Sequence, residues 1–289
     1  MSSEYRGDVG CRGATMSRNA VKALNARRLG NGEEVLILAH GLGTNQTAWL
    51  PFLPVLADHY SIVLYDLACA GSVDPAYFDF VRHHEIAGHV DDLLEIIAAL
   101  ELQQCIFLGH SVSGMIGLLA AQRRPGAFSK LMLVGSSPRY IDDKDYRGGM
   151  DGKTVATIFD AIASNYRDWA KSFAPVVVGK DADHPATTSF LSSLLAMRPD
   201  IALAMFRGIL TSDYRHVLPD ISCPVTVLQS REDAAVPLAA AQYLSRHLPR
   251  SELVIVDASG HLPHCSAPAA FVSALAGRLD GIERAKFDS

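Results

Sequence analysis

The sequence predicts an α/β fold in which a mostly parallel, doubly wound sheet is interrupted by a helical insertion. Two observations support this prediction. Short, continuously apolar runs alternate with longer helical patterns along the first half of the chain, and the alternation stops after residue 137 and resumes after residue 218. Parallel strands that are covered by helices on both faces are apolar throughout, as these runs are.

The core of the fold is predicted to consist of residues 20–137 and 219–280. Buried strands are predicted at Glu34–Ala39, Ser61–Tyr65, Cys105–Leu108, Leu131–Val134, Val225–Leu228 and Leu253–Val256. Helices are predicted at Thr47–Leu56, His84–Leu100, Val112–Gln122, Pro237–His247 and Ala267–Leu279. This order of strands and helices implies parallel pairing with a helical layer on each face of the sheet.

Residues 138–218 contain no convincing strand and are predicted to form a helical lid. Helical patterns occur at Thr154–Tyr166, Tyr166–Phe173, Pro185–Ala196 and Pro199–Leu210. Proline is favoured in the first turn of a helix, which fits the starts at Pro185 and Pro199. Because ligands bind at the carboxyl edge of such sheets, a helical insert at that edge is expected to cover the site.

The composition excludes several classes of function. The chain has 289 residues, and its 26 basic and 31 acidic side chains leave a net charge of -5. No broad basic field is present, so nucleic acid is not an expected partner. The longest apolar runs, such as Val35–Ala39, are far shorter than the ~18 residues of a membrane span, and no membrane association is expected.

Targeting signals and cysteines favour a reducing compartment. Residues 1–19 lack the apolar stretch of a secretory signal and are expected to form a flexible extension, while residues 281–289 are expected to form a tail. The number of cysteines is odd and no C-x-x-C pair occurs, as their positions show: Cys11, Cys69, Cys105, Cys223 and Cys265. We therefore expect free thiols and a cytoplasmic location.

The segment Gly109-His-Ser-Val-Ser113 carries the most informative chemical signal. A predicted strand ends at this segment and a predicted helix begins after it, which is the setting of the G-x-S-x-G nucleophile elbow. Ser113 replaces the last glycine, and a small residue there still satisfies the packing. Ser111 is therefore predicted to be a nucleophile, although a serine that merely caps the helix is the simpler alternative.

A serine hydroxyl needs a base, and the base in turn needs a carboxylate. His261 follows the last predicted strand and is the favoured base, with His264 as the alternative. Asp233 follows the preceding strand and is the favoured acid, with Glu232 as the alternative. The chain order serine, acid, histidine is the order that this arrangement requires.

The oxyanion hole requires two backbone N–H donors. We assign one to Val112, directly after the nucleophile, and the other to Leu42 in the glycine-containing segment Gly41–Thr44. This segment does not complete a dinucleotide-binding pattern, and no P-loop occurs, so no cofactor is expected. No metal is expected either, because no carboxylate or thiolate cluster accompanies the two histidines of His261-Leu-Pro-His264.

Three segments in the lid region are specific enough to point to a family: Ser137-Pro-Arg-Tyr140, Phe173-Ala-Pro175 and Met197-Arg-Pro-Asp-Ile201. With these segments, the chain from about Val21 to Leu279 resembles the small plant α/β-hydrolases that perceive strigolactones and karrikin-type butenolides, and their bacterial stress-signalling relative. The resemblance implies a V-shaped lid of four helices inserted after the sixth strand. It also implies a triad of Ser111, Asp233 and His261.

The resemblance further implies an apolar and aromatic pocket beneath the lid. The matching positions in this chain are Leu42, Tyr140, Ile158, Trp169, Phe173, Ile209 and Leu210. Members of the family commonly carry Phe at the positions of Leu42 and Leu210. Both residues are smaller here, which predicts a wider or reshaped pocket.

Two functions are compatible with these residues. The resemblance implies a slow hydrolase that acts on ester or lactone bonds and serves as a receptor for a small apolar butenolide. Such a receptor is expected to be a monomer, to be located in the cytoplasm and the nucleus, and to signal through an F-box-type protein. The alternative is a metabolic esterase or lactonase for small apolar esters with no signalling partner. A pure binding module is disfavoured, because binding alone needs no base.

Overall fold

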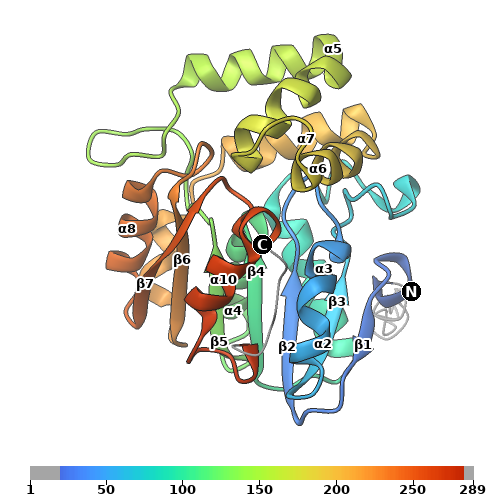
Figure 1. Ribbon diagram of the computed structural model, residues 1–289, viewed down its shortest axis with the longest axis vertical. Helices are drawn as coiled ribbons and strands as arrows, with labels where there is room; N and C mark the ends of the chain where they lie inside the picture. Colours follow the sequence, from blue (N-terminus) through green and yellow to red (C-terminus); the bar gives the residue numbers. More distant parts are fainter. Residues whose placement is uncertain (1–19, 283–289) are drawn as a thin grey trace, which may run out of the picture.

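A computed structural model of the protein describes residues 20–282, which form a seven-stranded sheet beneath a layer of helices (Figure 1). The strand order is β1-β3-β2-β4-β5-β6-β7. The strands are β1 (Arg27–Leu29), β2 (Glu34–Ala39), β3 (Tyr60–Tyr65), β4 (Cys105–His110), β5 (Phe128–Val134), β6 (Val225–Glu232) and β7 (Ser251–Ser259). All neighbouring strands pair in parallel except β1, which is antiparallel to β3. The predicted parallel sheet is therefore confirmed.

Helices cover both faces of the sheet. The helical elements of the core are η1 (Gln46–Phe52), α2 (Leu53–Leu56), η2 (Pro75–Tyr77), α3 (Ile86–Ala99), α4 (Val112–Arg123), η3 (Arg215–Asp220), α8 (Leu238–His247), α9 (Pro263–Ser266) and α10 (Pro268–Leu275). Alternate residues of β2 enter different cores: Ile37 belongs to the core that includes side chains of α3, α4 and α8, whereas Leu38 belongs to the core that includes side chains of η1, α2 and α10. Both faces are buried, which is why the strand sequences are continuously apolar.

Two elements differ from the sequence-based predictions. The segment predicted as one helix at Thr47–Leu56 is the 3₁₀ helix η1 followed by the short helix α2. Pro51 and Pro54 explain this, because each lacks the N–H that a continuous α-helix would need. Strand β1 was not predicted, since its three residues are mostly exposed and include two arginines.

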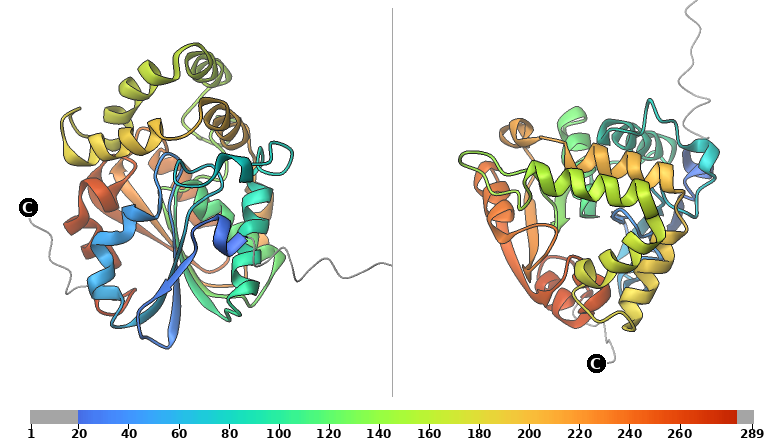
Figure 2. Two further views of the ribbon diagram at one scale, coloured as in Figure 1. Left: turned by 90° about the vertical axis from the view of Figure 1, so that its right-hand side faces the viewer. Right: turned by 90° about the horizontal axis from the view of Figure 1, so that it is seen from above.

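The lid consists of α5 (Gly152–Val178), α6 (Pro185–Leu195) and α7 (Pro199–Leu210). These helices cross above the carboxyl edge of the sheet (Figures 1 and 2). The backbone of α5 is non-helical at Asn165, so the two predicted helices that meet at Tyr166 are the two segments of one kinked helix. The insertion after the sixth strand is corrected: in residues 20–282 the lid lies between β5 and β6, and five strands precede it.

An ion-pair cluster joins the two chain segments that connect the lid to the core. Arg139, before the lid, and Asp213, after it, form a β-bridge and an ion pair with a distance of 2.7 Å between Nη1 and Oδ2. Arg215 also binds Asp213 at 2.7 Å and reaches Asp143 at 2.9 Å. The two ends of the insertion are thereby held at the same place on the sheet edge.

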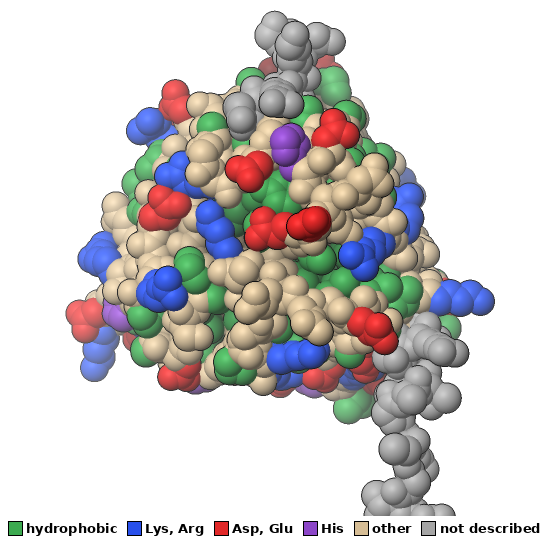
Figure 3. Space-filling model, turned by 90° about the horizontal axis from the view of Figure 1, so that it is seen from below, with side chains coloured by type: hydrophobic (Ala, Val, Ile, Leu, Met, Phe, Trp, Pro, Cys, Tyr) green, Lys and Arg blue, Asp and Glu red, His purple; other side chains and the backbone are tan. Residues whose placement is uncertain are grey.

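The surface charge, the lengths of the helices and the state of the cysteines were also predicted from the sequence. Viewed from the side opposite the lid, acidic and basic side chains are interspersed (Figure 3). Within residues 20–282 no single helix is long and apolar enough to cross a membrane. Taken together, α6 and α7 have the length and composition of a membrane span, but the chain bends by 106° between them. Cys69, Cys105, Cys223 and Cys265 are free thiols. Cys11 and the extension at residues 1–19 lie outside the described residues, as does most of the tail at 281–289.

Candidate active site

Ser111 occupies a sharp turn between β4 and α4. Its backbone has φ +55° and ψ −122°, a region that L-residues rarely adopt. Gly109 permits this turn, because a Cβ atom there would lie 2.7 Å from the backbone carbon of Ser113. At Gly114 a Cβ atom would lie 1.9 Å from Ser136 Oγ, so the glycine requirement falls one residue later than the sequence motif expects. Ser113 fits because its hydroxyl donates a hydrogen bond to the carbonyl of His40 at 2.5 Å.

The structure brings together the three predicted side chains of the triad. His261 Nε2 lies 2.8 Å from Ser111 Oγ, and His261 Nδ1 lies 2.8 Å from Asp233 Oδ2. An ionised carboxylate can only accept, so Nδ1 carries the proton and Nε2 is free to accept the proton of the serine. The side chains of all three residues are buried, and they follow the carboxyl ends of β4, β6 and β7.

Asp233 is held as an ionised acceptor. Its Oδ1 atom accepts from the N–H groups of Ala235 at 2.8 Å and Val236 at 3.0 Å, and its Oδ2 atom also accepts from Gln229 Nε2 at 3.0 Å. Burial raises the pKa of Asp233, but His261 and these hydrogen bonds outweigh burial and leave the pKa below its ordinary value. Glu232 instead accepts from Ser259 Oγ at the surface. The geometry therefore favours Asp233 over Glu232.

The loop that carries Leu42 is pressed against the nucleophile. At Gly41 a Cβ atom would lie 2.3 Å from His110 Nδ1 and 3.1 Å from Ser111 Cβ, so no larger residue fits. Within the described part of the chain, the N–H groups of Leu42 and Val112 donate no hydrogen bond to another backbone group. Unpaired N–H groups beside a nucleophile are what an oxyanion hole requires.

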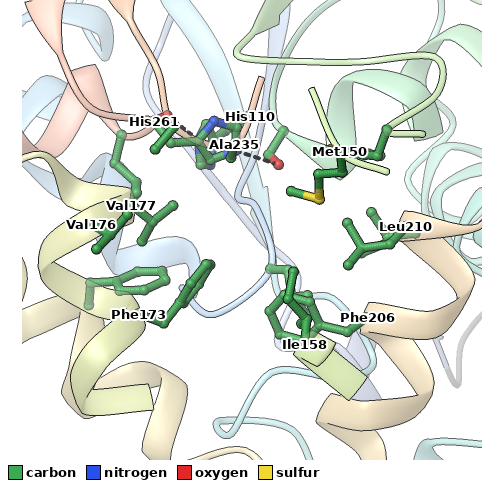
Figure 4. Close-up of a pocket in the computed structure, with 17 residues that line it drawn as sticks. His110, Met150, Ile158, Phe173, Val176, Val177, Phe206, Leu210, Ala235 and His261 are labelled. Carbon is green, nitrogen blue, oxygen red and sulfur yellow. Dashed lines mark hydrogen bonds between the residues drawn. The ribbon is translucent and has the colours of Figure 1, made fainter. Parts of the chain in front are cut away.

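An apolar cavity of about 100 Å³ lies between the triad and the lid. In Figure 4, Phe173, Val176 and Val177 on α5 face Phe206 and Leu210 on α7 across it, with His261 at one end. Six of the seven predicted pocket residues line the cavity: Leu42, Tyr140, Ile158, Phe173, Ile209 and Leu210. Tyr140 lines the cavity together with Ser111, and burial raises the pKa of its hydroxyl.

The seventh predicted pocket residue, Trp169, does not line the cavity, so the prediction that it forms part of the pocket is corrected. Its ring stacks on Phe173 with 4.8 Å between centroids and meets Phe206 edge to face at 5.0 Å. Trp169 therefore supports two rings that do face the cavity. Its position on a lid helix could be read from the sequence, but the kink at Asn165 that rotates this part of α5 could not.

Several lining residues were missed by the sequence analysis: Met150, Val176, Val177, Phe190, Phe206, Ala234, Ala235 and Leu262. Helical spacing contained a signal for some of them. Val176 and Val177 follow Phe173 by three and four residues, and Phe206 precedes Ile209 and Leu210 by the same intervals, so each group shares a helix face. Met150 and the two alanines lie in loops, where no periodicity could identify them.

His264, the alternative base, lies behind the catalytic histidine. Its ring is stacked on Trp49 at 4.6 Å and lies 4.6 Å from the ring of His110. Burial lowers the pKa of His264 to about 3, and neither of its ring nitrogens has a hydrogen-bond partner in residues 20–282. The same range contains no group of three side chains suited to hold a metal ion. The structure therefore favours His261 over His264 as the base.

Comparison with known proteins assigns the family. The model of the alpha/beta hydrolase family matches residues 36–274. The chain belongs to this family. It is 46% identical over 252 residues to the strigolactone esterase D14 of Arabidopsis thaliana, which covers 87% of this chain and 94% of that protein. It is 42% identical over 248 residues to the karrikin insensitive 2 receptor CA of Petunia hybrida, covering 86% and 92%.

A solved structure agrees with this assignment. A hydrolase from Oleispira antarctica superposes with a TM-score of 0.86 and 29% sequence identity, and the match covers 91% of this chain and 97% of that one. The resemblance to strigolactone and karrikin receptors that the lid segments indicated is thus confirmed, and so is the α/β-hydrolase fold.

Proposed function

We propose that this α/β-hydrolase is a slow serine hydrolase that serves as a receptor for butenolides of the strigolactone or karrikin kind. The observation that carries the proposal is the pair of hydrogen bonds that joins Ser111, His261 and Asp233 at one end of an apolar cavity beneath the lid. The names of the relatives, a strigolactone esterase and a karrikin receptor, support both the hydrolytic and the receptor part.

The geometry supports a two-step acyl transfer. His261 Nε2 accepts the proton as Ser111 Oγ attacks the carbonyl carbon of the ester or lactone. Asp233 stabilises the imidazolium, and the N–H groups of Leu42 and Val112 receive the negative charge on the carbonyl oxygen. The proton then passes to the departing oxygen, and water hydrolyses the acyl-enzyme to restore the serine.

The cavity supports a small ligand. An apolar cavity of about 150 Å³ accepts a single benzene-sized ring, and drug-sized ligands occupy about 300–1,000 Å³. The cavity here is about 100 Å³. A single butenolide ring suits this volume, with apolar contacts from the lid and polar contacts from the triad side of the cavity, where Ser111, Tyr140 and His261 lie.

The proposal extends to a partner and a location. By relation to the receptors of this family, the protein is proposed to act as a monomer in the cytoplasm and nucleus and to present its lid to an F-box-type protein when a ligand is bound. The competing function is a metabolic esterase or lactonase with no such partner, and the same triad favours it equally.

Turnover and melting temperature separate these two functions. The purified protein is given stereoisomers of a synthetic butenolide ester, and product release and thermal unfolding are both measured. A receptor is expected to turn over far below the ~10 per second of a typical enzyme and to change its melting temperature with one stereoisomer. Fast turnover of many simple esters, with no stereoisomer altering the melting temperature, contradicts the receptor function and favours the metabolic one.

A further inference from the structure

A second cavity, of about 240 Å³, adjoins the catalytic one on the other side of Phe190 and Leu262. Three segments form its walls: residues 44–51, which follow the oxyanion loop; α6; and residues 262–268, which follow the catalytic histidine. Phe190 and Leu262 line both cavities and therefore belong to the wall between them. We call the second one the outer cavity.

The shared wall stands where the leaving group of an ester must depart. Phe190 packs against the oxyanion loop, because a Cβ atom at Gly43 would lie 2.9 Å from its ring. Leu262 directly follows His261, whose Nε2 atom must approach the departing oxygen to return the proton. The catalytic cavity itself, at about 100 Å³, is the smaller of the two.

The lining of the outer cavity is uncharged but can form hydrogen bonds. Among the described residues that line it there is no Asp, Glu, Lys or Arg. The hydroxyls of Ser189 and Ser193 on α6 bond to none of the residues in the described range, and the buried His264 ring has two unpaired nitrogens. Such walls suit a neutral molecule that is partly apolar and carries a hydroxyl.

We propose that the outer cavity is the leaving-group subsite of this hydrolase and takes the alcohol half of an ester whose acyl half occupies the catalytic cavity. The proposal rests on the hydrolytic function proposed above. Ser111 Oγ forms a bond to the carbonyl carbon, the bond from that carbon to the alcohol oxygen breaks, and the oxygen keeps the electron pair. His261 supplies the proton, and the neutral alcohol moves between Phe190 and Leu262 into the outer cavity.

The test fills the outer cavity without touching the triad. Ser193→Trp places an indole in it from the surface of α6, and Ser192→Trp is the matched control, because Ser192 is exposed on the same helix and lies outside the cavity. Two butyrate esters are compared, one of methanol and one of 2-(2-naphthyl)ethanol. In Ser193→Trp the ratio of kcat/KM for the naphthyl ester to that for the methyl ester is expected to fall about tenfold, and in Ser192→Trp it is expected to stay at the wild-type value.

Folding is checked by thermal melting, and Ser189→Trp, one turn earlier on the same face of α6, replaces Ser193→Trp if the latter is unfolded. An unchanged ratio in the folded variant, with both esters still hydrolysed, overturns the subsite and leaves the hydrolytic function standing. An equal fall in the control overturns it as well. Hydrolysis of neither ester by the wild-type protein removes the proposed function, and the subsite with it.

Discussion

The triad and the inner surface of the lid face the same cavity, but different forces hold them. Two hydrogen bonds of 2.8 Å join Ser111, His261 and Asp233 at the sheet edge. The lid opposite them offers rings and aliphatic chains, such as Phe173 and Phe206, which pack without polar bonds to the cavity. Hydrogen bonds depend steeply on direction, whereas dispersion contacts are weak and numerous. The chemistry of the site should therefore fail when one group is removed, and its ligand preference should shift gradually.

One set of contacts connects the two regions. The N–H of His261 donates to the carbonyl of Val177 at the end of α5, at 2.7 Å. A Cβ atom at Gly260 would lie 2.0 Å from the carbonyl oxygen of Val178. The last turn of α5 thus rests on the loop of the catalytic histidine, and we expect a displacement of the lid to shift that histidine.

The largest effect is expected from Ser111→Ala, which removes the nucleophile and leaves the apolar cavity intact. Activity toward p-nitrophenyl acetate is expected to fall by about 10³-fold or more, because the base-activated path is lost as a whole. The melting temperature should stay within a few degrees of wild type. Retention of more than about a tenth of the activity would show that another residue performs the attack.

Asp233→Asn and Glu232→Gln compare two adjacent carboxylates. Asp233 accepts from the histidine, whereas Glu232 accepts from a surface serine. An amide at position 233 cannot accept in the same way or stabilise the imidazolium, so kcat is expected to fall by about 10²-fold or more. The Glu232 variant should resemble wild type. If the Glu232 variant is the inactive one, the acid is misassigned.

Gly260→Ala tests the contact between the lid and the histidine. Gly277→Ala is the matched control: both glycines have positive φ, +98° and +71°, but nothing lies within 4 Å of a Cβ atom at Gly277. Both variants bear the backbone strain of about 1–2 kcal/mol. Only Gly260→Ala should also lower kcat, by about tenfold to 10²-fold, because it displaces His261. Equal kcat values in the two variants would show that the contact between the end of α5 and the His261 loop does not position the histidine.

Leu42→Phe together with Leu210→Phe tests the apolar side of the comparison. Both residues line the catalytic cavity. The added rings should exclude a bulky strigolactone analogue while a bare butenolide still binds, and any strain should cost about 1–3 kcal/mol of stability. Binding titrations with both ligands measure this. Equal weakening of both ligands, or no change in either, shows that these positions do not set the size of the pocket.

The smallest effect is expected from His264 and depends on pH. Burial holds its folded-state pKa at about 3, below the unfolded value of about 6.5. Between these values the unfolded state binds more protons, so stability is lost as the pH falls below about 6.5. At pH 5.5 the loss from this residue should be about 1 kcal/mol. His264→Phe keeps an aromatic ring against Trp49 and should make the free energy of unfolding less dependent on pH. The free energy of unfolding of the wild type and of His264→Phe is measured with denaturant at pH 7.5 and 5.5. An equal loss of stability in the two proteins contradicts this role of His264.

Local patterns in the sequence were sufficient to predict six of the seven strands and the catalytic side chains at the edge of the sheet. Apolar runs become strands because both faces of a parallel sheet are buried, and a strand, a tight turn and a helix in succession place Ser111 in an elbow. Chain order then indicated Asp233 and His261. These signals are local: each depends on a few neighbouring residues whose backbone conformation restricts which side chains are possible.

The contacts between the lid and the carboxyl edge of the sheet could be read only from the tertiary structure. Packing within the lid holds Trp169 against Phe173 and Phe206, outside the cavity lining, and the fold places Phe190 and Met150 in the cavity wall. It also joined Val177 to His261 and left the outer cavity behind Leu262. No local pattern encodes these contacts, because many apolar residues can fill the same volume and only the complete packing determines which of them do.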